Sequence, residues 1–148
     1  MKKENAYYGA YHQSGVIPYR DHRKHGLELL LITSRNSKKW IFPKGIVESR
    51  LSPQDSAAKE AYEEAGIRGK IDPELFGSFT YKKWDGTCRV LLYLMQVKKE
   101  LKSWPENDFR KRQWFPFEIA KELVNPKPVQ KLLYTLPEAL NTEIHKND

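Results

Sequence analysis

The stretch GIVESRLSPQDSAAKEAYEEAGI, residues 45–67, decides the fold of this 148-residue chain, because it predicts a loop followed by a short helix. Ser52 is a favourable N-cap, Pro53 suits the first helical position, and Gly66 suits the position just past the last turn. We therefore predict a helix of about 13 residues, roughly 20 Å long at 1.5 Å per residue.

The predicted helix has two distinct faces. Glu60, Glu63 and Glu64 are spaced i, i+3 and i+4, which places their carboxylates on one face. Like charges at this spacing cost a few tenths of a kcal/mol in an isolated helix, and a divalent cation would convert that repulsion into binding. A second face carries small side chains that allow close backbone packing: Ala57, Ala58, Ala61 and Ala65.

The length suits one domain covering residues 1–148, with 1–8 and 141–148 expected to fray. The excess of 26 basic over 19 acidic residues suits either a polyanionic ligand or simply a basic, soluble surface. Cys88 is the only cysteine, which excludes an internal disulfide and favours a reducing compartment, and its apolar neighbours indicate a buried thiol. Because the chain has neither an apolar signal-peptide core nor a run of ~18 apolar residues, we expect a cytoplasmic protein.

Apolar runs predict strands at residues 10–19, 27–33, 40–43, 67–71, 76–83, 87–97 and 110–117. Residues 118–124 predict a further helical turn or two, and 128–136 carry a helical apolar stripe that Pro137 stops or kinks. Trp84-Asp85-Gly86 predicts a tight hairpin turn, and residues 20–26 predict a basic, solvated loop. The fold class is therefore α/β or α+β, with a largely antiparallel or mixed sheet.

The spacing within residues 45–67 resembles the Nudix box, G-x5-E-x7-R-E-U-x-E-E-x-G-U, in which U is an aliphatic residue. The lead-in WIFPKG, residues 40–45, is also similar to that of many Nudix hydrolases. Two positions depart from the box, because Leu51 stands where it has glutamate and Lys59 where it has arginine. The positions that match are Gly45, Glu60, Glu63, Glu64, Gly66 and Ile67, with Ala61 as a small substitute.

The resemblance implies a Nudix fold, a mixed sheet sandwiched between helices, and cleavage of a nucleoside diphosphate linked to another group with Mg²⁺ or Mn²⁺. It implies that Glu60, Glu63 and Glu64 bind the metal, with the Gly45 carbonyl as a further ligand. Phosphoanhydride hydrolysis needs charge neutralisation and an aligned water, which carboxylates holding hard cations supply. Glu63 and Glu64 are both candidates for activating that water, and the sequence does not choose between them.

The two departures fall on a pair that in the family braces the loop against the helix. Leu51 cannot accept a hydrogen bond, and Lys59 lacks the bidentate fork of arginine. Lys59 could instead pair with Glu63 or Asp55, and Glu48 could supply the missing loop carboxylate. We expect an active enzyme with an altered brace, and reduced activity is the alternative.

Two resemblances bear on the substrate. Residues 110–115 and 127–130 are similar to the C-terminal part of diphosphoinositol polyphosphate phosphohydrolases, which also cleave diadenosine polyphosphates, whereas Lys44 in the lead-in resembles diadenosine tetraphosphate hydrolases. Both substrates are densely anionic. The basic residues that we expect to bind substrate phosphate are Arg35, Lys39, Lys44, Arg89, Arg112 and Lys127. Tyr81, Trp84 and Trp114 could stack on a base, with core packing the default for Trp114.

The leading hypothesis is therefore a metal-dependent pyrophosphohydrolase whose partner is a small anionic molecule, of the nucleotide or inositol polyphosphate type, and not a membrane. One alternative is removal of pyrophosphate from the 5′ end of RNA. The other is a catalytically weak domain that binds a nucleotide or polyphosphate as a sensor, which the departures at Leu51 and Lys59 motivate.

Overall fold

The structure is a computed structural model that describes residues 10–22, 24–83 and 86–147. The predicted turn residues Trp84 and Asp85 lie outside these residues, as does the N-terminal segment that we expected to fray. The strands are β1 (Ala10–His22), β2 (Gly26–Thr33), β3 (Trp40–Ile41), β4 (Lys44–Ile46), β5 (Ile67–Ile71), β6 (Gly77–Lys83), β7 (Gly86–Glu100) and β8 (Arg112–Pro116). The helices are α1 (Pro53–Glu60), the π-helix η1 (Ala61–Ala65), α2 (Phe117–Leu123), α3 (Lys127–Leu132), the 3₁₀-helix η2 (Leu133–Thr135) and α4 (Leu136–Asn147).

Within the described residues, eight strands form one mixed sheet in the order β3-β2-β1-β7-β5. The long central strands β1 and β7 run parallel, and the other strand pairs are antiparallel. Strand β4 pairs with β1, β6 with β7, and β8 with β2. This arrangement confirms the predicted mixed sheet.

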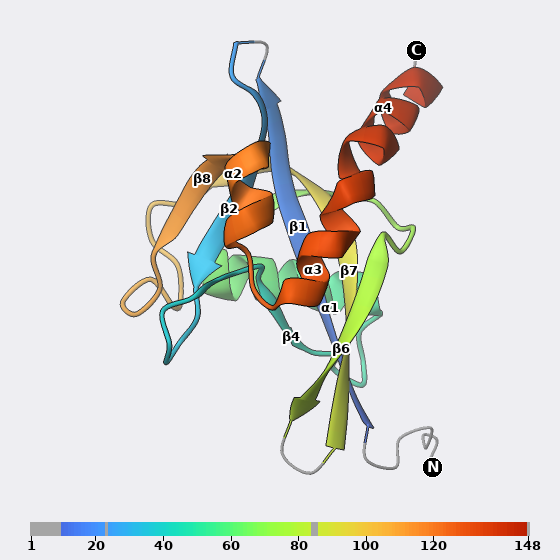
Figure 1. Cartoon of the computed structure of the whole chain (residues 1–148). Helices are drawn as coiled ribbons and strands as arrows, with labels where there is room; N and C mark the ends of the chain where they lie inside the picture. Colours follow the sequence, from blue (N-terminus) through green and yellow to red (C-terminus); the bar gives the residue numbers. More distant parts are fainter. Residues whose placement is uncertain (1–9, 23, 84–85, 148) are drawn as a thin grey trace.

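Helices cover both faces of the sheet, as Figure 1 shows, with α2 and α3 on one side and α1 on the other. Strand β2 explains this, because its residues alternate between two hydrophobic clusters. Leu29 and Leu31 join the cluster under α2, α3 and α4, while Leu30 and Ile32 join the cluster under α1 and η1. The latter cluster includes three fully buried alanines of the predicted small face: Ala57, Ala61 and Ala65.

Three predicted elements differ from the structure. Strand β1 continues to His22, so the basic loop is shorter than residues 20–26, and Arg20 pairs with Glu28 of β2 at 2.7 Å. Residues 44–46, predicted as loop, form β4 against β1. Helix α3 ends before Pro137, and Pro137 lies in the first turn of α4, where its missing N–H costs nothing. No helix among the described residues is long and apolar enough to cross a membrane.

Candidate active site

The glutamate-bearing helix begins and ends as its sequence predicts, but its last part is not α-helical. The Ser52 hydroxyl accepts a hydrogen bond from the Asp55 N–H at 3.0 Å, and Gly66 ends the helix in the left-handed region at φ 64°. Between them, residues 61–65 form the π-helix η1, which carries Glu63 and Glu64. Such single π turns are rare and often mark functional sites.

Glu64 is the most enclosed carboxylate of this helix, with 8% of its surface exposed. Its Oε1 accepts a hydrogen bond from the Lys44 backbone N–H at 3.2 Å, and its Oε2 lies 3.5 Å from Arg110 Nη2. Burial raises the pKa of Glu64 to about 7, because it disfavours the charged form more than Arg110 and the Lys44 N–H favour it. Glu64 is therefore a carboxylate that can exchange a proton near neutral pH.

Glu60 lies directly against the backbone of Gly45 in strand β4. A Cβ atom added at Gly45 would lie 2.3 Å from the Glu60 carboxyl carbon, so only glycine permits this approach. Burial raises the pKa of Glu60, and the neighbouring charge of Glu63 raises it further. The charge of Glu60 in turn raises the pKa of Glu64, so Glu60 lies close enough to both other glutamates to interact with each.

Lys59 connects the loop to the helix in place of the family's arginine. Its Nζ lies 2.9 Å from Glu48 Oε2 in the loop and 2.9 Å from Glu63 Oε2 on η1. The loop is held from a second side by buried Ser56, whose hydroxyl accepts from the Glu48 N–H at 3.1 Å and donates to the Ile46 carbonyl at 3.3 Å. Glu48 therefore supplies the carboxylate that is missing at position 51.

The loop before β8 adds a carboxylate and an arginine that the sequence analysis missed. Glu106 donates its backbone N–H to the Glu63 carbonyl at 3.1 Å, and its charge raises the pKa of both Glu60 and Glu64. Arg110, with 9% of its side chain exposed, lies 2.7 Å from Glu106 and also donates to the Thr33 carbonyl at 2.9 Å. In the sequence, Glu106 stands in a charged connection and Arg110 begins the predicted strand 110–117, and neither position signals a contact with the helix.

The donor set fits a hard divalent cation by its chemistry. Oxygen ligands are those that Mg²⁺ and Mn²⁺ prefer, and three carboxylates on adjacent turns leave an excess of negative charge for a cation to neutralise. Among the described residues, however, no three carboxylate, imidazole or thiol groups are already arranged as metal ligands. Glu63 Oε2 is paired with Lys59 instead, so a cation bound by this oxygen would have to displace the Lys59 ammonium.

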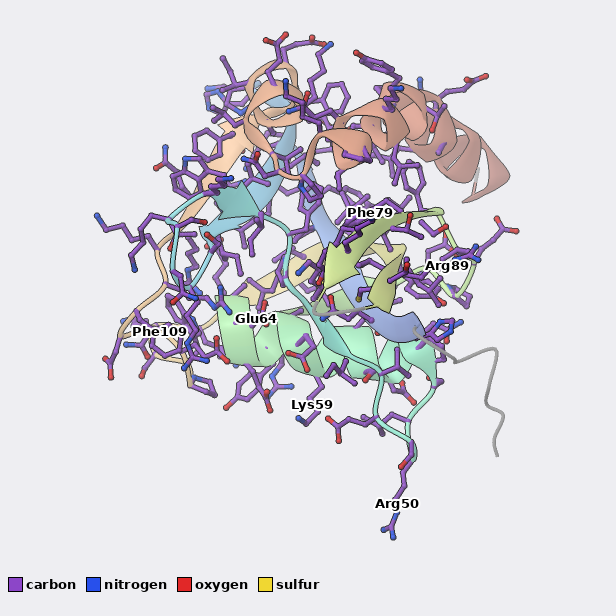
Figure 2. All side chains as sticks on the ribbon, turned by 60° about the horizontal axis from the view of Figure 1, so that its bottom comes forward. Arg50, Lys59, Glu64, Phe79, Arg89 and Phe109 are labelled. Atoms are coloured by element: carbon purple, nitrogen blue, oxygen red, sulfur yellow. The ribbon has the colours of Figure 1, made fainter. Side chains whose placement is uncertain are left out.

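The basic residues that we predicted to bind phosphate do not gather at one place. Arg35 stacks on the Phe109 ring at 4.5 Å, and the Lys44 ammonium lies 5.5 Å from the centre of the Tyr81 ring. Arg89 donates to the Ser78 hydroxyl at 3.3 Å, far from Glu64 in Figure 2. Lys39 is exposed before β3, and Lys127 is exposed at the start of α3. Phosphate binding by these side chains stays a prediction.

Arg112 has a different surrounding from the one that we expected. Its guanidinium donates to the carbonyls of Ala65, Gly66 and Leu101 at 2.8, 3.2 and 2.6 Å, respectively. It also stacks on the Trp104 ring at 4.0 Å, and the Trp104 indole donates to the Glu64 carbonyl at 3.0 Å. These contacts place Arg112 at the C-terminal end of η1, where it satisfies carbonyls that lack helical partners.

The aromatic candidates for base stacking are placed as follows. Tyr81 stacks with Phe79 at 6.2 Å, and its hydroxyl donates to Gln13 at 3.2 Å. Trp114 packs against the cluster under α1, in agreement with its expected place in the core, and Trp84 lies outside the described residues. Cys88 is fully buried, as its apolar surroundings predict.

Comparisons with known proteins agree with this geometry. The NUDIX domain model matches residues 13–135. Nudix hydrolase 16, mitochondrial, of Arabidopsis thaliana is 34% identical over 126 residues, covering 74% of this chain and 69% of that protein. Diphosphoinositol polyphosphate phosphohydrolase 2 of Rattus norvegicus is 41% identical over 104 residues, covering 68% of this chain and 56% of that protein.

A similar fold occurs in the crystal structure of a C. elegans Ap4A hydrolase binary complex, with a TM-score of 0.72 and 20% identity. The match covers 89% of this chain and 98% of that one, and at this identity it bears on the fold alone. The residues that this family model matches include strand β4 with Gly45, the glutamate helix and most of the sheet. The chain therefore belongs to the Nudix family and is a hydrolase of phosphoanhydride bonds.

Proposed function

We propose that this protein is a Mg²⁺- or Mn²⁺-dependent pyrophosphohydrolase that cleaves a nucleoside diphosphate linked to another group, or a related small molecule rich in phosphate. The observation that carries the proposal is the placement of Glu64, a buried carboxylate with a pKa of about 7 beside Glu60, Glu63 and Glu106. We propose that residues 1–148 form this single catalytic domain.

In the proposed mechanism each residue has a separate task. Glu60, Glu63 and Glu64 would hold the cation together with the Gly45 carbonyl, and a bound cation would neutralise phosphate charge and acidify water. Glu64 accepts the proton of the attacking water, because its carboxylate is almost closed to solvent and held in place at the end of the acidic face. Arg110 and the Lys44 N–H keep the Glu64 carboxylate oriented during this transfer.

The substrate range follows from the relatives and from the charge of the chain. The rat relative is a diphosphoinositol polyphosphate phosphohydrolase, and the C. elegans protein is an Ap4A hydrolase. Both names indicate densely anionic substrates, which suit a chain with a net charge of +7. We propose the same class here, with Arg35, Lys39, Lys44, Arg89 and Lys127 as phosphate contacts.

The test is a hydrolysis panel with Mg²⁺ or Mn²⁺: diadenosine tetraphosphate, a diphosphoinositol pentakisphosphate, a nucleoside triphosphate and 5′-triphosphorylated RNA. We expect turnover of at least one small molecule, and a loss of about a hundredfold or more in Glu63→Gln and Glu64→Gln. Glu74→Gln, an exposed glutamate outside the helix, is the matched control. No turnover of any compound contradicts the proposal, and faster turnover of RNA supports the alternative substrate.

A second candidate function, a weakly active sensor, is favoured by one specific contact. Lys59 Nζ lies 2.9 Å from Glu63, so its ammonium competes with a cation for this carboxylate. Calorimetry would distinguish a sensor by submicromolar binding of a panel member without turnover in saturating metal.

We propose a cytoplasmic location on the evidence of the lone cysteine, Cys88. The names of several Arabidopsis relatives place those proteins in mitochondria. Fractionation of cells that express the full chain would decide the location.

A further inference from the structure

An open cavity of about 550 Å³ lies beside the glutamate helix, between the turn before β3 and the loop before β8. Its size is within the range of ordinary ligand pockets. Lys38 and Trp40 line it from one side, and residues 107–111 line it from the other. The Lys38 ammonium donates to the Phe109 carbonyl at 3.2 Å, which ties the two sides together.

This cavity connects to the carboxylates through a single side chain. Arg110 lines the cavity and at the same time reaches Glu64 at 3.5 Å and Glu106 at 2.7 Å. In Figure 2 the label of Phe109 marks this loop at the end of the helix where Glu64 lies, while Arg89 lies at the opposite end. A ligand seated in the cavity would therefore touch the same arginine that contacts Glu64.

The charge around the cavity suits a ligand that carries only one or two phosphate groups. The positive charge of Arg110 is already neutralised by two carboxylates. Lys38 and Lys111 of the lining, and Arg35 on the Phe109 ring, then stand against Asp108. A surplus of about two positive charges matches one or two phosphate groups. An inositol ring with a phosphate on nearly every carbon would place several unpaired negative charges next to Asp108, and such juxtaposition is costly.

The remaining lining suits a planar base. Phe109 presents an aromatic ring that already stacks with the Arg35 guanidinium at 4.5 Å, and a base can extend such a stack. The exposed Asp108 carboxylate receives one hydrogen bond, from the Asn107 amide at 3.3 Å, and carboxylates accept up to four. It can therefore also accept the N–H groups on the edge of a base.

We propose that this cavity binds the nucleoside end of the substrate, with the base on the Phe109 ring beside Arg35 and its N–H edge toward Asp108. The proposal rests on the proposed function and narrows it to nucleotide substrates, because Lys38 and Lys111 meet only the phosphates next to the nucleoside. Phe109 and Asp108 become specificity-determining residues that the box motif does not contain.

The experiment measures binding in EDTA, so that turnover plays no part. Adenosine 5′-monophosphate is the nucleoside probe, tripolyphosphate the base-free probe, and inositol hexakisphosphate the crowded anion. We expect Phe109→Leu, which keeps apolar volume but removes the ring, to weaken monophosphate binding about fivefold or more, since base–aromatic stacking is lost. Binding of tripolyphosphate should stay unchanged. Tyr134→Leu, at an aromatic residue with 71% exposure on η2, is the matched control.

Asp108→Ala gives an independent test, because it should change the binding of two probes in opposite directions. It should weaken adenosine monophosphate binding several-fold and strengthen inositol hexakisphosphate binding, because it removes an acceptor and a negative charge together. Unchanged monophosphate binding in both variants, or equal weakening of all three probes, would overturn the proposal. Neither outcome depends on hydrolysis, so an inactive wild type in the substrate panel would contradict the proposed function separately.

Discussion

At the scale of single residues, Glu64 differs from its neighbours because both of its oxygens have partners while it is almost closed to water. The Lys44 N–H and the Arg110 guanidinium do not fully offset its desolvation, and its pKa rises to about 7. A carboxylate held in this way is protonated for much of the time at neutral pH when no cation is bound. Metal binding and proton binding therefore compete at this residue.

The unfolding free energy of the metal-free protein should depend on pH through the protonation of Glu64. Because the folded-state pKa of Glu64 lies above the unfolded value of about 4.5, the folded state binds more protons between these two values. Its contribution to stability is thus most favourable below about pH 4.5 and is lost as the pH rises to about 7. Relative to wild type, Glu64→Gln should gain about 3 kcal/mol of unfolding free energy between pH 4.5 and 7.5. Urea unfolding in EDTA measures this, and parallel pH profiles of the two proteins would contradict it.

Lys59 carries the connection that the family assigns to arginine and glutamate. If Lys59 positions the loop through Glu48, Lys59→Met should lower kcat/KM by between about ten- and a hundredfold, because small displacements near the chemistry are costly. Glu48→Gln should do the same, and the double variant should be no worse than either one. Lys59→Arg is the conservative control and should keep most activity. Additive losses in the double variant would mean that the two residues act separately.

At the scale of elements, strand β4 packs against the glutamate helix where the Gly45 backbone contacts the Glu60 carboxyl group. Gly45→Ala should cost little stability, since the flexible carboxylate can move away from the new Cβ. The same movement should reduce kcat/KM by about a hundredfold, because Glu60 no longer lies where a cation needs it. The matched variant Gly69→Ala places its Cβ 2.1 Å from the rigid Gln96 carbonyl of β7 and should do the reverse. Thermal melting and kinetics of both variants distinguish the two effects.

The end of η1 offers a direct test of what Arg112 does. Because its guanidinium donates to three backbone carbonyls, Arg112→Ala should lower the unfolding free energy by about 2–3 kcal/mol. The KM of the folded variant should change little. If Arg112 binds phosphate, as the sequence led us to expect, KM should rise instead while stability is kept. Lys131→Ala, at an exposed basic residue of α3, is the control.

At the scale of the whole molecule, the site combines three segments of the chain: strand β4 with Gly45, the glutamate helix and the loop before β8. The sheet brings them together, because β8 pairs with β2 and the helix packs on the face that holds Leu30 and Ile32. The net charge of +7 then acts on any substrate that approaches this site.

Ionic strength should therefore change substrate capture more than chemistry. The screening length falls from about 10 Å at 0.1 M salt to about 3 Å at 1 M, which removes long-range attraction between the basic surface and a polyphosphate. We expect kcat/KM to fall by about tenfold or more over this range, with kcat nearly constant. A fall in kcat alone would show that salt acts on the catalytic groups instead.

Much of the fold could be predicted because the signals are local. Hydrophobic periodicity placed most strands within a few residues, and the caps at Ser52 and Gly66 placed both ends of the glutamate helix. The π turn, strand β4 and the extension of β1 to His22 could not be predicted, since each depends on contacts with distant residues. Arg20, for example, reads as part of a solvated loop until Glu28 is seen opposite it.

By itself, then, the sequence determined the family, the glutamate face of the helix and the absence of the box glutamate at Leu51. These depend on residue type and spacing along one continuous segment. Only the tertiary structure decided that Glu48 replaces that carboxylate, that Glu106 and Arg110 join the site, and that Arg112 supports the helix end. The physical reason is that ion pairs and burial depend on distances in space, which the packing of separate segments determines.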